Sequence, residues 1–170
     1  MNIHLGVLIM NNLVWSSNME LGIPEVDKAH RCFVQKLSNI IHEPELNFES
    51  RYLSLVSDLE LDFKEEEGIM ESIQFYEILP HREQHAKVLE VLHAAIPDVK
   101  YGINGSALHV LESLPKWFLF HLKSMDALFA TWFNLQNSSL ALESYLINAP
   151  QIPGGVNSGT FSSGHAHHFS

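Results

Sequence analysis

The segment from Tyr52 to Ile73 places apolar residues along one side of a predicted helix, with a single carboxylate among them. The apolar members are Tyr52, Val56, Leu59, Phe63, Met70 and Ile73. Because their spacing alternates between four and three residues, they share one face of an α-helix. Position 66 completes the series, and it holds Glu66. A lone buried carboxylate is costly, so Glu66 must be paired, protonated or bound to a metal.

Three further segments show helical periodicity, and no strand pattern competes with them. The first predicted helix begins near Pro24, a residue suited to a first turn, and ends before Pro44. The second begins after Asn47 or Ser50 and runs to about Ile73. The third opens after Pro80 and ends at a loop over 96–106. The fourth runs from Ser106 to roughly Asn134, and Pro115 is expected to kink or restart it.

Four amphipathic helices with short connections predict an all-α fold, an antiparallel up-down four-helix bundle. We expect residues 1–22 to form an N-terminal arm and residues 23–136 to form the bundle. Residues 137–170 are expected to add a short helix, at about 138–148, and a flexible C-terminal tail from Pro150 onward.

The length and charge of the chain limit its class and its partners. A length of 170 residues suits one domain with a sizeable core. The net charge of −10, from twenty acidic and ten basic residues, argues against binding to nucleic acid or to a membrane surface. The apolar run near the N-terminus lacks a preceding Lys or Arg and is too short to span a bilayer. We therefore expect a soluble, cytoplasmic protein.

Each predicted helix carries a polar side chain on its inward, apolar face. These residues are His30 in the first helix, Glu66 in the second, His81 and His85 in the third, and His121 in the fourth. A single inward histidine is most often a hydrogen-bonded core residue. Five such residues without a metal would need five separate partners, because buried polar groups are almost always paired.

The residue types indicate which metals would suit this interior. Imidazole and carboxylate ligands together favour iron, manganese or zinc. Cys32 lies two positions after His30, and therefore on another face, which argues against a thiolate site. Several histidines plus carboxylates exceed the needs of one metal, so two metals bridged by carboxylate are the natural count.

Four motifs of this chain, in order, resemble those of the bacterial hemerythrins: "LGIPEVDKAH", "FKEEEGIM", "HREQH" and "WFLFHLKSMD". The resemblance covers about residues 15–132. It implies an oxo- or hydroxo-bridged di-iron centre, with two iron ions as cofactor, that binds dioxygen reversibly inside a four-helix bundle. Carried over by position, His81, His85 and His121 would hold one iron, His30 would help hold the other, and Glu66 and Asp126 would bridge them. Glu65 and Glu67 would then be solvated neighbours.

The resemblance alone brings Asp126 to the site. Asp126 follows His121 by five residues, which is about 140° around an ideal helix. The inward series read by periodicity is Leu114, Phe118, His121, Met125 and Leu128 instead. A local widening of the helix would help to bring Asp126 onto the face of His121.

Position 62 departs from the family pattern, which has a histidine four residues before the bridging glutamate. This chain has Asp62. The resemblance gives that histidine to the iron that receives O2. Either Asp62 ligates the second metal and makes the centre richer in carboxylate, or it stays unligated and the second metal binds weakly or is lost.

Three functions remain open on the sequence. The first is a non-enzymatic domain for O2 binding, storage or sensing. The second, favoured by Asp62, is a carboxylate-enriched di-iron enzyme that activates O2 or peroxide. The third is a metal-poor interaction domain that keeps the fold.

Overall fold

The computed structural model describes residues 13–148, and these residues form helices and short connections without any strand. The elements are η1 (Ser17–Met19), α2 (Pro24–His42), α3 (Phe48–Ser72), α4 (Ile78–Lys100), α5 (Gly105–His121), η2 (Leu122–Asp126) and α6 (Ala127–Asn148). The last three follow one another without a break. Residues 1–12 and the whole of the flexible tail expected from Pro150 onward lie outside the described residues.

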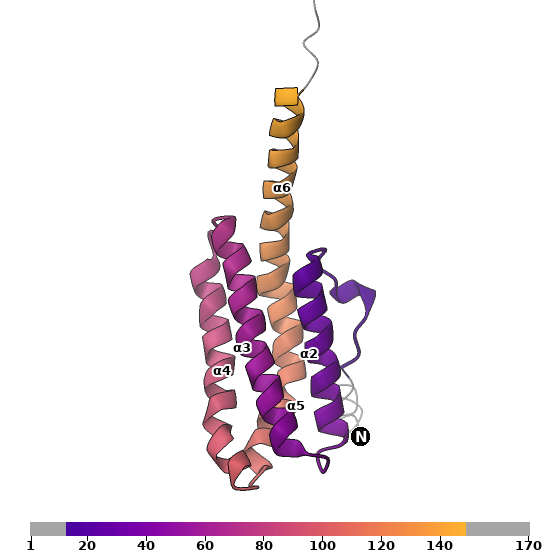
Figure 1. The fold of residues 1–170 in the computed structure, drawn as a ribbon, viewed down its shortest axis with the longest axis vertical. Helices are drawn as coiled ribbons and strands as arrows, with labels where there is room; N and C mark the ends of the chain where they lie inside the picture. Colours follow the sequence, from indigo (N-terminus) through magenta and orange to yellow (C-terminus); the bar gives the residue numbers. More distant parts are fainter. Residues whose placement is uncertain (1–12, 149–170) are drawn as a thin grey trace, which may run out of the picture.

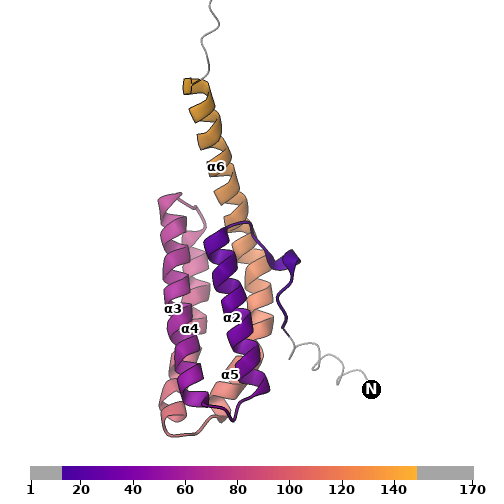
Figure 2. The ribbon, with the colours of Figure 1, turned by 45° about the vertical axis from the view of Figure 1, so that its right-hand side comes forward.

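The four helical rods form an antiparallel up-down bundle, as the sequence predicted (Figure 1). Helix α3 packs against α2 and α4, α5 packs against α4, and α2 closes the ring by packing against α5. The connections between the rods span only a few residues, so neighbouring rods must run in opposite directions. Figure 2 shows the same ring of rods from a second direction. No helix within residues 13–148 has the length and hydropathy that a membrane span requires.

Asp27 fixes the segment that leads into the bundle. Its carboxylate accepts the backbone N–H of Leu21 at 2.7 Å and that of Gly22 at 3.0 Å. Gly22 has a φ of 79°, a conformation that favours glycine. This turn delivers Ile23 into the core, where it is fully buried, immediately before Pro24 opens α2.

Two helices are longer than the sequence predicted. Helix α4 begins at Ile78, because Pro80 lies in its first turn, where a missing N–H costs little. It also continues through Pro97 to Lys100, so the expected loop over 96–106 is wrong in its first half. Continuing the helix buries Val99, which is 1% exposed. That burial offsets the hydrogen bond that Pro97 removes.

The fourth rod does not end near Asn134, and the predicted short helix over 138–148 is the end of α6. The residues of α6 include no Gly or Pro to stop the helix. Pro115 does not restart the rod either, since α5 is helical on both sides of it.

The core has two parts. The larger cluster is built on residues such as Phe33, Phe63, Val88, Leu114 and Phe118. The smaller cluster consists of Ile23, Val26, Met70, Phe75, Phe129 and Ala130. Along the chain, the inward polar residues of α2, α3 and the fourth rod lie between residues of the larger cluster and residues of the smaller cluster. The polar residues therefore form a layer that divides the core.

A π-helical turn sets the register of the fourth rod. Residues Leu122–Asp126 form this turn, and the N–H of Ala127 donates to the carbonyl of Leu122, five residues back. The wider turn absorbs one extra residue, so the inward face moves on by one position. Asp126 and Phe129 are fully buried, whereas Leu128 is 37% exposed. The inward assignment of Leu128 is therefore wrong, and the expected widening after His121 is confirmed.

Deletion of Ser124, an exposed residue of the π turn, should be tolerated. Removing one residue converts the turn to α-helix and leaves Asp126 and Phe129 facing inward. Unfolding of the metal-free protein by urea should show a free energy within about 1 kcal/mol of wild type. Deletion of both Lys123 and Ser124 should cost about 3 kcal/mol or more, because Phe129 then leaves the core. Equal losses in both variants would contradict this account of the register.

Candidate metal centre

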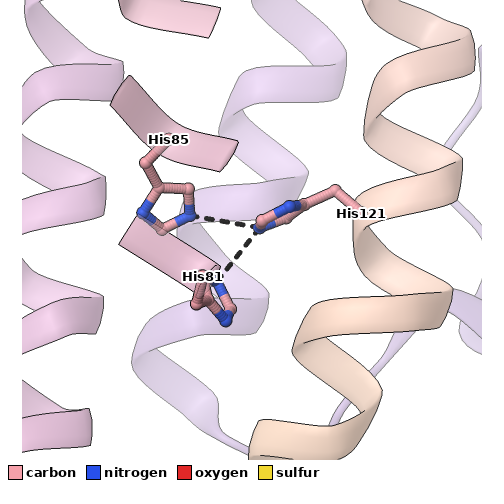
Figure 3. Close-up of side chains that lie close together, drawn as sticks. All are labelled: His81, His85 and His121. Atoms are coloured by element: carbon pink, nitrogen blue, oxygen red, sulfur yellow. Dashed lines mark hydrogen bonds between the residues drawn. The ribbon is translucent and has the colours of Figure 1, made fainter. Parts of the chain in front are cut away.

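Three histidines from two rods converge in the middle of the bundle. His81 and His85 lie one turn apart on α4, and His121 ends α5 (Figure 3). Nε2 of His121 lies 3.0 Å from Nε2 of His81 and 3.1 Å from Nε2 of His85. All three residues are at most 2% exposed. Nε2 of a neutral imidazole either donates or accepts one hydrogen bond, so three facing Nε2 atoms cannot all pair well, whereas a cation between them satisfies all three.

A second group lies beside the first and contains His30 of α2, Glu66 of α3 and Asp126 of η2. One ligand atom from each of these residues lies within 4.8 Å of the other two, and the same holds for the three histidines. The sequence therefore named six residues that the fold does bring together, from all four rods.

The two carboxylates of the second group, Glu66 and Asp126, also lie close to the histidines of the first group. Oδ1 of Asp126 lies 3.0 Å from Nε2 of His121 and 3.3 Å from Nε2 of His81. Its other oxygen, Oδ2, lies 3.5 Å from Nε2 of His30. The oxygens of Glu66 lie 3.5 Å from Nε2 of His85 and 3.8 Å from Nε2 of His81. A carboxylate between the three histidines and His30 has the position that a bridging ligand needs.

Several of these buried atoms have no hydrogen-bond partner among residues 13–148. They are Oε1 of Glu66, both carboxylate oxygens of Asp126, and Nδ1 of His30, His81 and His121. Close approach of the Asp126 oxygens to imidazole nitrogens therefore occurs without hydrogen-bonding geometry. Unpaired buried oxygens are expensive in an apolar interior, and a cation would remove that cost. The residues present thus fit a bound metal.

Burial sets the protonation states of the site. It lowers the pKa of His30, and together with the charges of His81 and His121 it lowers the pKa of His85 to about 2. Burial and the charge of Asp126 raise the pKa of Glu66 well above its usual range. Burial acts the same way on Asp126, but contacts with His121 and His81 outweigh it and lower the pKa of Asp126. The imidazoles of His30 and His85 are therefore held neutral, the form that binds metals.

Aromatic rings hold the imidazoles in place. Phe63 stacks on His85 with ring centroids 3.7 Å apart and planes 2° apart. Trp117 stacks on His121 at 4.8 Å and 20°. The edge of one ring meets the face of the other where His30 contacts Phe118, at 5.2 Å and 84°. Side chains locked by packing keep the ligand atoms pre-arranged, which lowers the ordering cost of metal binding.

Glu67 is not the solvated neighbour that the sequence led us to expect. Its side chain is 22% exposed, and Oε1 lies 3.0 Å from Nδ1 of His85. Nε of Arg82 donates to its other oxygen at 2.9 Å, and Arg82 also pairs with Glu71. A carboxylate on the outer nitrogen of a ligand histidine fixes the ring and makes Nε2 a better donor of electrons. Glu65, by contrast, is exposed as expected.

Asp62 stands apart from both groups of converging atoms. It lies one turn before Glu66 on α3 and is half buried. It lines a cavity with His30, Glu66, Phe63 and Phe118 that has a volume of about 30 Å³ for the centre of a water-sized molecule. Burial, with the charges of Asp58 and Glu65, raises the pKa of Asp62 to about 6. The structure thus places Asp62 at the edge of the site, on a cavity that His30 also lines.

Comparison with known proteins finds one informative similarity. The chain is 28% identical, over 118 residues, to a protein named bacteriohemerythrin from Ralstonia nicotianae. The aligned part covers 69% of this chain and 86% of that protein. No family model matches the sequence, and no solved structure matches it. The similarity supports the hemerythrin-like family, and hence the metal-binding character, that the four sequence motifs indicated.

Replacement of Glu67 by alanine should weaken metal binding about 10- to 100-fold, because His85 loses the partner that orients it. The measurement is the rate at which a chelator removes the metal, together with the metal content after dialysis. Glu65→Ala removes an acid from the exposed side of the same turn and should change neither quantity. Glu66→Ala should cost the most, in metal and in unfolding temperature. A Glu67→Ala variant that behaves like Glu65→Ala would show that the contact with His85 has no effect.

Proposed function

We propose that this protein is a non-haem di-iron protein that binds dioxygen reversibly, for O2 binding, storage or sensing. One observation carries the proposal: Asp126 directs one oxygen to the His81 and His121 imidazoles and the other to His30. Two metals that share a carboxylate require this arrangement, and one metal does not. The similarity to a protein named bacteriohemerythrin supports iron over the other metals that prefer such ligands.

The proposal gives each residue a role. His81, His85 and His121 would hold one iron, His30 would hold the other with or without Asp62, and Glu66 and Asp126 would bridge the pair. Two bound irons would supply the electrons that reversible binding of O2 requires. Phe63, Trp117 and Phe118 surround the imidazoles with apolar surface and limit the access of water.

The cavity beside Asp62 supports dioxygen as the ligand. Its walls are mainly apolar, and its volume of about 30 Å³ admits one or two small molecules. It lies on the side of His30 and Asp62, which the family resemblance gives to the iron with an open position. A larger substrate would not fit this cavity without movement of the surrounding side chains.

The purified protein should contain about two iron atoms per chain after expression in iron-rich medium, because the buried oxygens of Glu66 and Asp126 need cations. Elemental analysis against protein concentration measures the content. Anaerobic reduction followed by exposure to air should then give an absorption change that reverses when O2 is removed. A folded bundle with no metal would refute the proposal and leave an interaction domain.

Asp62 favours a second candidate, an enzyme that uses a carboxylate-enriched di-iron centre to activate O2 or peroxide. An anionic oxygen ligand stabilises the ferric state more than a neutral imidazole does. A centre of that kind would oxidise quickly in air instead of binding O2 reversibly. Turnover of a reductant with O2 or peroxide, and no reversible spectrum, would support the enzyme.

Replacement of Asp62 by histidine should restore the family pattern one turn before Glu66. If Asp62 reaches the second metal, the variant should slow oxidation in air by about tenfold or more, since an activation barrier higher by about 1.4 kcal/mol slows a reaction tenfold. Stopped-flow absorption of the reduced protein mixed with O2 measures the persistence of the oxygenated spectrum.

The control Lys64→His adds the same ring on the exposed side of α3 and should leave the rate unchanged. Identical, long-lived spectra in wild type and Asp62→His would show that Asp62 does not act on the metal.

A further inference from the structure

Helix α6 continues past the end of the bundle as a single rod (Figures 1 and 2). Nε1 of Trp132 donates to the carbonyl of Ile73 at 3.1 Å and ties α6 to the end of α3. Beyond Gln136, every side chain that the structure describes is exposed. The large apolar ones along the rod are Leu135, Leu140, Leu142, Tyr145 and Ile147, which are 58–82% exposed.

The projecting part of α6 has little to stabilise it as a lone helix. Helices shorter than about 12–15 residues are marginal in water even when they are rich in alanine. This part contains Asn137, Ser138 and Ser139, which are weak helix formers. Glu143 is its one charged residue, so it has no opposite charges to pair along the helix. A surface that covers the apolar side chains would account for the helix.

The apolar residues are spaced for contact with another helix. Leu128, Leu135 and Leu142 follow one another at intervals of seven. Residues at this spacing stay on one side of a helix and can fill one of the two positions per heptad that form the seam of a coiled coil. Leu128 is 37% exposed, so the stripe already begins where α6 still belongs to the bundle. Leu140 and Ile147 are also seven apart and lie about 120–140° around the helix from Leu135, which widens the apolar surface.

Charge selects a further copy of this chain as the partner. The whole chain has a net charge of −10, yet Glu143 is the only charged residue of α6. Two acidic bundles would repel each other over most of their surface but not along α6. A helix that lies on an anionic membrane surface carries Lys or Arg, and α6 has neither. A different protein partner is usually selected by several charges beside the seam, and α6 has only Glu143.

We propose that the projecting part of α6 is a self-association helix, which packs against the same segment of a second copy with Leu135 and Leu142 in the seam. The proposal is independent of the metal centre and of O2 binding.

The test is sedimentation equilibrium of the full, metal-loaded chain over a range of concentrations. Wild type should form dimers reversibly. Leu142→Glu places a charge near the middle of the seam and should raise the dissociation constant about 100-fold or more. Ser144→Glu adds the same charge about 160° away around the helix and should leave association unchanged. Unaltered metal content and unfolding temperature in Leu142→Glu would show that the bundle is intact.

Three outcomes would overturn the proposal. Wild type that stays monomeric at every concentration excludes self-association. Equal effects of Leu142→Glu and Ser144→Glu exclude a seam on the leucine stripe. Monomers that bind to phosphatidylcholine vesicles in a flotation assay, with loss of binding in Leu142→Glu, would assign the stripe to a membrane surface instead.

Discussion

The burial of ionisable side chains in the middle of an apolar core is the constraint on which the rest of this structure depends. Glu66 and Asp126 are 5% and 0% exposed, and their oxygens lie among imidazole nitrogens with which most do not hydrogen-bond. Two buried carboxylates without a cation repel each other, and each loses its hydration. A metal would turn this cost into a source of stability, because binding to the folded state alone favours folding. Metal loading and folding should therefore be strongly linked in this protein.

The arrangement also depends on details beyond helix position. A π turn brings Asp126 onto the face of His121, although Asp126 follows His121 by five positions. Phe63 and Trp117 hold two of the imidazoles by stacking, and Glu67 holds one of those from behind through Nδ1. Arg82 in turn holds Glu67, and Arg82 lies next to His81 on the same helix. The pre-arrangement of the site thus comes from packing and from a chain of paired charges on two neighbouring rods.

Sequence periodicity was sufficient for the bundle and for the inward placement of His30, Glu66, His81, His85 and His121, because 3.6-residue periodicity determines which side of a helix is buried. It failed at Leu128, since a π turn shifts the register without any marker in the residue pattern. It also failed at Glu67, whose role depends on the distance between α3 and α4, a tertiary quantity. The length of α4 was missed because Pro97 lies in its last turns, where proline costs little compared with the burial of Val99. Asp126 was found through the family resemblance and not through periodicity.

The polar layer has a consequence for how the molecule opens. It separates a large apolar cluster from a small one of six buried residues, which joins the start of α2 to the loop after α3 and to the first turns of α6. A small cluster cut off from the main core has few contacts of its own, so it forms a separate cooperative unit of low local stability. Without a metal to join the two parts, amide hydrogens around Met70, Phe75 and Phe129 should exchange with solvent earlier than those around Leu92 and Leu111. In that state the end of the bundle from which α6 projects would unfold locally and transiently, while the opposite end stays folded.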